Sequence, residues 1–441
     1  MFGAWTEIFL HAFVVAAAAW LAVVAARNPD AIAFALKSIL RRWRITSVVM
    51  ATILVCVVAL VALGGYFYHS FWGLSESTIR SETGHFQIYR KGYEANSKTD
   101  PWTWKLRQLR EIRDLFASDT FLAHRVSVLA PELQFTGLLS NGDVSQTFLG
   151  RAVDPASDRK LSSFGEEIAK GSRFVDGDAG CALVGAGLAQ SLSAKPGSSL
   201  TLLTSNPRSG MASADLDVKG VTESFSRDYD DVALKIPLST AWDMIGDTLV
   251  DKVVVLLEST TDLDTVLSRT KIAASSRGLD FEYKTWLELA TYYKSVKNLY
   301  TNIFRFFSVV ILVFSVVFIT SILFIMILQR TYEIALLRAF GAPPAAVLRN
   351  FVSESILMAF IGATASILIA LFAAWIFNIH GLATDPPPGS TRGYVIKLRV
   401  IEEPLFVLQV WEFIVTAVVL SSIIPAWRGC RAKIVQSLRN G

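Results

Sequence analysis

The stretch FFSVVILVFSVVFITSILFIMIL, residues 306–328, decides the class of fold. It contains no charged residue, and it is longer than the roughly 20 apolar residues that a helix needs to cross a hydrocarbon core of about 30 Å. A buried helix of a soluble protein is the alternative interpretation, but such helices have shorter apolar runs. We therefore predict a transmembrane helix here.

Three further runs, at residues 45–68, 351–376 and 406–424, are of similar length and nearly free of charge. The whole chain of 441 residues is 52% hydrophobic and only 18% charged, whereas soluble proteins have about 25% charged residues. The sequence therefore predicts a membrane α-helical fold with a core of four helices.

A fifth apolar run, residues 8–26, is less clear. It begins after Glu7 with no Lys or Arg before it and ends at Arg27, whereas a secretory signal begins with basic residues. We predict an extra amino-terminal membrane helix within residues 1–30 that runs from outside to inside. An interfacial helix and a misplaced start codon are the alternatives.

Basic residues gather at one set of span ends, and basic loops stay in the cytoplasm. The three clusters are Lys37, Arg41, Arg42 and Arg44; Arg330, Arg338 and Arg349; and Arg428, Arg431, Lys433 and Arg439. We therefore expect a multi-pass protein of a bacterial inner membrane, with residues 73–285 and the loop 379–404 in the periplasm.

The long polar segment between the first two spans has the composition of a globular domain, and it predicts a large α+β periplasmic domain. Expected strands are 86–89, 126–129, 146–152, 199–204, 216–221, 232–236 and 252–257, and expected helices are 102–116, 238–245 and 261–276. Cys181 is its only cysteine, so we expect no disulfide within it.

Two further helices are expected, one before the first span and one that joins the periplasmic domain to the second span. In residues 31–44, apolar and basic side chains form separate stripes, which predicts an amphipathic elbow helix on the cytoplasmic surface. In residues 286–328, an apolar face that includes Leu289, Tyr293 and Tyr300 runs into the second span. We expect a stiff stalk there that continues into the span and carries motion outwards.

The cytoplasmic segment 329–350 carries the candidate site. A helix should continue through Glu333 to Phe340 and stop at Gly341, and a second short helix should begin at Pro343 and Pro344. This second helix contains Arg349 and precedes the third span at 351–378. We expect it to contact a cytoplasmic partner.

Motifs for other chemistry are missing from the sequence. It contains no GxxxxGK[ST], HExxH or GxSxG segment, which argues against ATP binding, zinc proteolysis and serine hydrolysis by this chain. No basic and aromatic patch favours nucleic acid. We expect no enzyme activity, no cofactor and no metal in this chain.

Glu354 lies one turn into the third span. It either pairs with Arg338 or Arg349 and stiffens the cytoplasmic gate, or it is a carboxylate at the membrane interface.

The segment 333–342, EIALLRAFGA, resembles the signature of FtsX-domain permeases, the group of MacB, FtsX, LolC and LolE. The tail, with Pro425-Ala426-Trp427-Arg428 and then Ser437-Leu438-Arg439, is similar to the closing motif of that family. The resemblance covers residues 31–441. Residues 130–138 and 153–155 also look similar to LolC and LolE.

This resemblance implies a complex of two permease chains, identical or related, with a dimer of a cytoplasmic ABC ATPase that binds ATP and Mg²⁺. The predicted ATPase-coupling residues are Glu333, Arg338, Gly341, Pro343, Pro344 and Arg349. Closure of the ATPases would act through the stalk on the periplasmic domain, in the manner called mechanotransmission.

The cargo is left open by the sequence. Lipoprotein or another lipid-anchored molecule, passed to a periplasmic chaperone or adaptor, is our first expectation. MacB-like efflux of small molecules or peptides and FtsX-like activation of a cell-wall hydrolase are the alternatives. The extra amino-terminal segment, Trp427, Cys430 and the loop Pro386-Pro387-Pro388-Gly389 depart from the pattern of a lipoprotein-releasing subunit.

We accordingly divide the remainder of the chain into a first span at 45–72, a fourth span at 405–426 and a cytoplasmic tail at 427–441.

Overall fold

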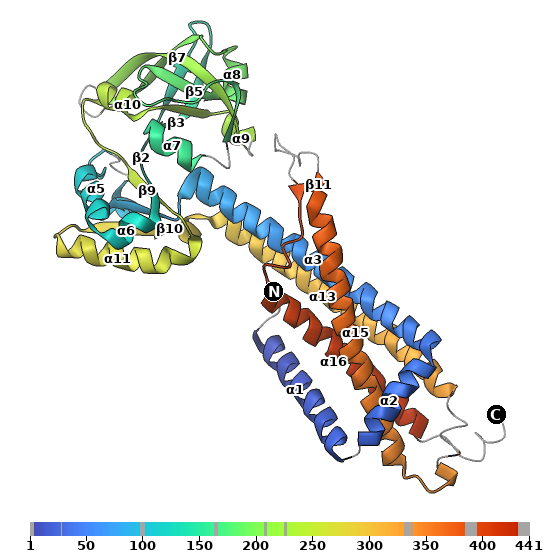
Figure 1. The fold of residues 1–441 in the computed structure, drawn as a ribbon. Helices are drawn as coiled ribbons and strands as arrows, with labels where there is room; N and C mark the ends of the chain where they lie inside the picture. Colours follow the sequence, from blue (N-terminus) through green and yellow to red (C-terminus); the bar gives the residue numbers. More distant parts are fainter. Residues whose placement is uncertain are drawn as a thin grey trace. The chain divides into compact units, whose positions relative to one another are not determined.

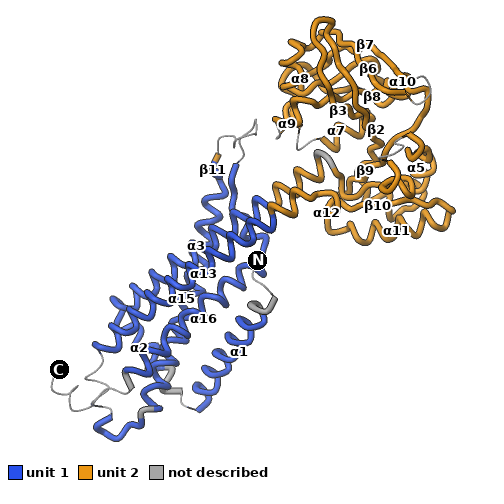
Figure 2. The backbone as a smooth tube through the Cα atoms, turned by 180° about the vertical axis from the view of Figure 1, so that it is seen from behind, with its two compact units in different colours: residues 1–71, 297–382, 395–441 blue, residues 72–296, 383–394 orange. Residues whose placement is uncertain are grey.

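The computed structural model describes residues 4–27, 29–97, 102–162, 166–206, 210–224, 227–329, 336, 338–383 and 395–430. The chain forms two compact units (Figure 2). Unit 1 comprises residues 1–71, 297–382 and 395–441, and unit 2 comprises residues 72–296 and 383–394.

Unit 1 is a bundle of helices (Figure 1). Its helices are α1 (Ala4–Arg27), α2 (Pro29–Arg41), α3 (Trp43–Thr78), α13 (Thr291–Leu328), α15 (Pro344–His380) and α16 (Pro404–Cys430), and α3 and α13 continue into unit 2. All except α2 are long and apolar enough to cross a membrane. The predicted membrane α-helical fold, with four core helices and an amino-terminal one, is thus confirmed.

The central helix of unit 1 is α16. Of its most apolar window, 61% is buried within the protein, compared with 28% for α13. Close packing around α16 depends on small residues: a Cβ at Gly64 of α3 would lie 2.0 Å from Cζ of Phe406. Small side chains permit such close approach of helices in a membrane, where packing replaces the hydrophobic effect.

The elbow helix α2 is amphipathic, as predicted. Ala35 and Ile39 are buried, Ile39 in the core of unit 1, whereas Leu36 and Leu40 remain exposed. Some apolar side chains of α2 therefore pack on the helix bundle, and others face away from it.

Unit 2 is built on a ten-stranded mixed sheet in the order β10-β1-β9-β2-β3-β8-β5-β7-β4, with β6 paired to β2 and β7. The strands are β1 (Phe86–Arg90), β2 (Val126–Ser140), β3 (Ser145–Val153), β4 (Glu166–Gly171), β5 (Cys181–Gly185), β6 (Ser199–Asn206), β7 (Gly210–Ser224), β8 (Ala233–Pro237), β9 (Lys252–Leu257) and β10 (Phe281–Thr285). Pairs β3–β8 and β5–β7 are parallel, and the others are antiparallel.

The helices of unit 2 are short and complete its core. They are α4 (Tyr93–Asn96), α5 (Leu109–Ser118), α6 (Thr120–Arg125), α7 (Pro155–Leu161), α8 (Ala186–Ser191), α9 (Arg227–Asp230), α10 (Leu238–Ile245), α11 (Leu263–Ser276) and α12 (Trp286–Leu289). A π-helical turn at Ile79–Thr83 and a 3₁₀ turn at Thr260–Asp262 are also present, and a small pair, β11 (Leu382–Ala383) with β12 (Val395–Ile396), follows α15. The predicted α+β domain is confirmed.

All seven predicted strands are present, but β4, β5 and β10 were missed. The predicted helix 102–116 is wrong in its first half, because α5 begins only at Leu109. The preceding segment is held extended: Leu106 exchanges backbone hydrogen bonds with Val250, and Lys105 is buried against Asp251 at 2.6 Å. Tertiary pairing overrides helix propensity there.

The stalk helix is confirmed from Thr291 onward, but not from Leu289. Leu289 ends the separate short helix α12, which a capping box at Thr285 and Glu288 initiates. The single helix α13 then continues through the whole second span.

Candidate functional site

The predicted coupling segment lies between α13 and α15. Glu333 lies outside the described residues, whereas Arg338, Gly341, Pro343, Pro344 and Arg349 lie within them. Phe340 N donates to the Leu336 carbonyl at 3.1 Å, and Gly341 N donates to that of Arg338 at 3.1 Å. These two bonds form the last turn of a helix that ends before Gly341.

The predicted left-handed stop at Gly341 is present, since its φ is +93°. Only glycine adopts this conformation without strain. Pro343 follows with extended dihedral angles, φ −67° and ψ 147°, and is the N-cap of α15. Pro344 occupies the first turn of α15, where a missing N–H is not needed. The chain therefore reverses direction through a turn that its sequence fixes locally.

The separate second short helix that we predicted is wrong. Residues 344–350 are the first two turns of α15, which runs without interruption to His380. The reason is packing: Val347 and Phe351 are buried in a small cluster with Ile327 of α13 and Ala426 of α16. This cluster, which we call the inner clamp, joins the cytoplasmic ends of three spans.

The two described arginines of the site are both half-buried. Arg349 lies on α15 next to the inner clamp, and its Nε is buried without a hydrogen-bond partner among the described residues. Phe340, by contrast, is 82% exposed at the turn. An exposed aromatic ring between basic residues is a suitable contact for another protein.

Glu354 is 4% exposed and accepts a hydrogen bond from Ser38 Oγ at 2.9 Å. It therefore ties α15 to the elbow helix α2, a contact that neither alternative from the sequence anticipated. The pairing of Glu354 with Arg338 or Arg349 stays a prediction.

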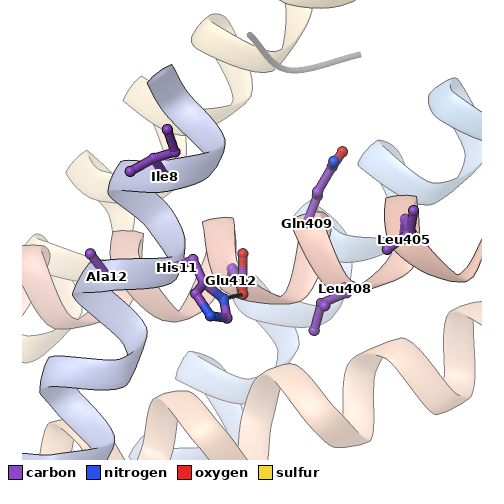
Figure 3. Close-up of a pocket in the computed structure, with 7 residues that line it drawn as sticks. All are labelled: Ile8, His11, Ala12, Leu405, Leu408, Gln409 and Glu412. Carbon is purple, nitrogen blue, oxygen red and sulfur yellow. Dashed lines mark hydrogen bonds and ion pairs between the residues drawn. The ribbon is translucent and has the colours of Figure 1, made fainter. Parts of the chain in front are cut away.

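A second polar site lies between α1 and α16, and the sequence did not point to it. Figure 3 shows the His11 ring directed at the Glu412 carboxylate, and Nδ1 and Oε1 are 2.8 Å apart. The two residues line a pocket of about 450 Å³, together with Ile8, Ala12, Leu405, Leu408 and Gln409. In the sequence, each of these residues is a single ionisable side chain within an apolar run. They become a pair only because α1 packs on α16.

Unit 2 contains buried ion pairs near the middle of its sheet. Arg151 of β3 pairs with Glu132 of β2, and Lys252 of β9 lies 3.4 Å from the same carboxylate. Burial alone would raise the pKa of Glu132, but these two cations lower it below its ordinary value. The strands β2, β3 and β9 are thus joined by charge as well as by their backbones.

A second ionic group joins β8 to α7. Lys235 is 4% exposed and binds Asp158 at 3.1 Å, Ser162 at 3.0 Å and also Glu166. Burial would lower the pKa of Lys235, but the two carboxylates outweigh this effect and raise it. Removal of one partner from such a buried ionic group typically lowers the free energy of unfolding by about 3–5 kcal/mol.

His85 is a buried neutral histidine. Its Nδ1 accepts a hydrogen bond from Leu257 N at 3.0 Å, and its Nε2 lies 3.0 Å from Thr260 Oγ1. Burial lowers the pKa of His85 from 6.5 to about 4. Because Nδ1 must be an acceptor, the ring has no place for a second proton.

Two family models match the chain. The MacB-like periplasmic core domain matches residues 46–271, and the FtsX-like permease C-terminal domain matches residues 305–434. The macrolide export ATP-binding/permease protein MacB of Rhodospirillum rubrum is 25% identical over 177 residues, which are 40% of this chain and 27% of that protein. The match thus spans about a quarter of that relative.

Two solved structures are also similar. One is the extracellular domain of the noncanonical ABC-type transporter YknZ from Gram-positive bacteria, at 13% identity, with a TM-score of 0.34 and coverage of 45% of this chain and 97% of that one. The other is a domain of a permease protein of Porphyromonas gingivalis, at 17% identity, with a TM-score of 0.25 and coverage of 36% and 70%.

The periplasmic core model covers more than half of the chain, the permease model covers the last three spans, and both fall on the units and helices that the structure describes. The chain therefore belongs to the FtsX-domain permeases of ABC transporters, the superfamily that includes MacB and LolC.

Proposed function

We propose that this permease transmits the motion of a separate cytoplasmic ABC ATPase to its periplasmic domain, and that this domain moves lipoprotein or another lipid-anchored cargo from the inner membrane towards the outer membrane. ATP and Mg²⁺ are bound by the ATPase, and this chain has no catalytic role. Cargo is moved on the periplasmic side and does not pass through the spans.

The continuity of two helices carries this proposal. Helices α3 and α13 comprise 36 and 38 residues, whereas a span needs about 20. Residues 72–78 of α3 and residues 291–296 of α13 belong to unit 2. A continuous helix is stiff, so displacement at its membrane end is passed to the residues beyond it.

The inner clamp supports the cytoplasmic half of this proposal. Val347 and Phe351 pack on Ile327 and Ala426, so a force on the start of α15 acts directly on α13 and α16. We propose that Arg338, Arg349 and the turn at Gly341 form the ATPase contact, together with Glu333. The assembly contains two permease chains and two ATPase chains.

A second cargo class is favoured by one observation. The curated relative from R. rubrum carries a name that assigns macrolide export. Export of small molecules through a periplasmic adaptor is therefore the alternative function, and it uses the same coupling site and stalk.

The cargo proposal is tested with the permease and its ATPase in proteoliposomes loaded with a triacylated lipoprotein. We expect ATP to release the lipoprotein to a soluble periplasmic chaperone, and we expect no release with a non-hydrolysable ATP analogue. ATP-dependent capture of an adaptor protein without lipoprotein release would favour the alternative. Activation of a cell-wall hydrolase with neither result would contradict both.

A further inference from the structure

The pair of His11 and Glu412 is an ionisable group in a membrane bundle, where such residues are costly and mark function. Glu412 is 5% exposed, and its side chain is in contact with the His11 ring, which is 69% exposed. The carboxylate is therefore held in a dry environment, while the imidazole faces outward beside it. The proposed coupling mechanism does not involve these two residues.

The position of the pair along the two helices indicates its depth. His11 and Glu412 each lie about two turns, or roughly 10–12 Å, from the amino end of α1 and of α16. The domain between α3 and α13 is extracellular, so α16 enters the membrane from the outer side. The side-by-side packing of α1 and α16, visible in Figure 1, places His11 at the same depth. The pair thus lies in the outer leaflet, close to the lipid headgroups.

The pocket combines apolar walls with a polar group, as a site for an amphiphile requires. Ile8, Leu405 and Leu408 line it with apolar surface and are all largely exposed, so they face the lipid chains. The polar floor is formed by Glu412, His11 and Gln409. A volume of about 450 Å³ falls within the range of roughly 300–1,000 Å³ of ligand pockets.

We propose that this pocket binds the headgroup and upper acyl chain of a zwitterionic aminophospholipid of the outer leaflet. The primary ammonium donates N–H bonds to the Glu412 carboxylate, and the lipid phosphate accepts a hydrogen bond from the exposed Nε2 edge of the His11 ring. A choline headgroup has no N–H to donate, and a glycerol headgroup has no cation. The bound lipid bridges α1 to α16, and this role is independent of which cargo the transporter moves.

The test is native mass spectrometry of the purified full-length chain with phosphatidylethanolamine, phosphatidylcholine or phosphatidylglycerol of identical acyl chains. Hydrogen bonds to a charged group are strong enough for about tenfold discrimination. We therefore expect about tenfold more retained phosphatidylethanolamine than either other lipid. Equal retention of the three lipids by the unchanged protein would overturn the proposal.

Two variants locate the site. Glu412→Gln should reduce phosphatidylethanolamine retention to the level of phosphatidylcholine, and His11→Gln should reduce the retention of all three lipids, because each carries the phosphate. Leu420→Ala, at an exposed position of α16 outside the pocket, is the matched control and should retain the preference. Because His11 is exposed, its variant keeps the core intact even if Glu412→Gln does not fold. Retention of all three lipids by His11→Gln at the level of the unchanged protein would refute the site.

Discussion

At the scale of single residues, His85 shows how a buried hydrogen-bond pattern sets a protonation state. Its Nδ1 accepts from the Leu257 amide, so protonation would place two donors against each other. The ring therefore stays neutral in the folded protein down to a pKa of about 4. In the unfolded chain the ring takes up a proton below pH 6.5 or so.

This difference predicts a loss of stability in acid. Between pH 6.5 and about 4 the unfolded state binds more protons at this site, so the free energy of unfolding falls as the pH falls. The depressed pKa corresponds to roughly 3 kcal/mol at about 1.4 kcal/mol per unit. Thermal unfolding of the full chain between pH 4 and 7 should therefore be less pH-dependent in His85→Gln.

His124→Gln is the control for this experiment. His124 is exposed, and its Nδ1 lies 2.8 Å from the Thr120 carbonyl of its own helix, so its replacement should leave the pH dependence unchanged. If His85→Gln and the wild type lost stability in parallel, the buried neutral ring would not be the cause.

Arg349 is the residue whose replacement tests the proposed ATPase contact most directly. Its guanidinium is half-buried beside the inner clamp, with Nε lacking a partner among the described residues. Arg349→Glu should weaken ATPase binding by about 1–2 kcal/mol, or about five- to thirtyfold. Binding of the ATPase to the permease in nanodiscs measures this effect.

Arg113→Glu provides the matched charge reversal, because Arg113 is an exposed residue of α5 in unit 2. It should leave ATPase binding unchanged. Equal binding by Arg349→Glu and the wild type would remove Arg349 from the interface.

At the scale of elements, the spans and most strands could be predicted because local pattern decides them. Charge-free runs such as residues 306–328 can only be membrane helices, and runs bounded by Gly, Pro and Asn became strands. Gly341 and Pro344 likewise set the turn of the coupling segment locally. For these residues, the sequence and the fold agree because few distant contacts are involved.

Other elements depend on partners far away in the sequence. The segment 102–108 looks helical, but its Leu106 pairs with Val250 and its Lys105 is buried against Asp251. Strand β2 continues through Pro131 to Ser140, although we predicted that it ends at Leu129. The sheet accepts this proline because β3 begins to pair only at Glu132. The pair of His11 and Glu412 was equally invisible, since 401 positions separate the two residues.

The stiffness of α13 yields a prediction at this scale. Ser295, Asn298 and Leu299 are exposed on α13, so their replacement changes the helix and not the core. Three glycines should weaken this part of the helix by about 3 kcal/mol relative to three alanines. We expect the triple-Gly variant to hydrolyse ATP with its ATPase normally but to lose the ATP-driven signal of a fluorophore at Ile272→Cys.

The triple-Ala variant at the same positions is the control, since alanine favours the helix. It should behave as the parent protein in both assays. A full fluorescence response in the triple-Gly variant would mean that α13 does not carry the motion.

At the scale of the whole molecule, each unit has its own core, and α3 and α13 are the two helices whose residues belong to both. The ionic groups around Glu132 and Lys235 fasten neighbouring elements of unit 2. The inner clamp has the same effect at the cytoplasmic ends of α13, α15 and α16.

The most direct test of this account is hydrogen exchange of the assembled transporter, measured by mass spectrometry with and without a trapped ATP state. If motion is transmitted, ATP should change the exchange of unit 2 as well as that of the coupling segment, and the triple-Gly variant should confine the change to the cytoplasmic side. Exchange in unit 2 that is identical with and without trapped ATP would contradict the account.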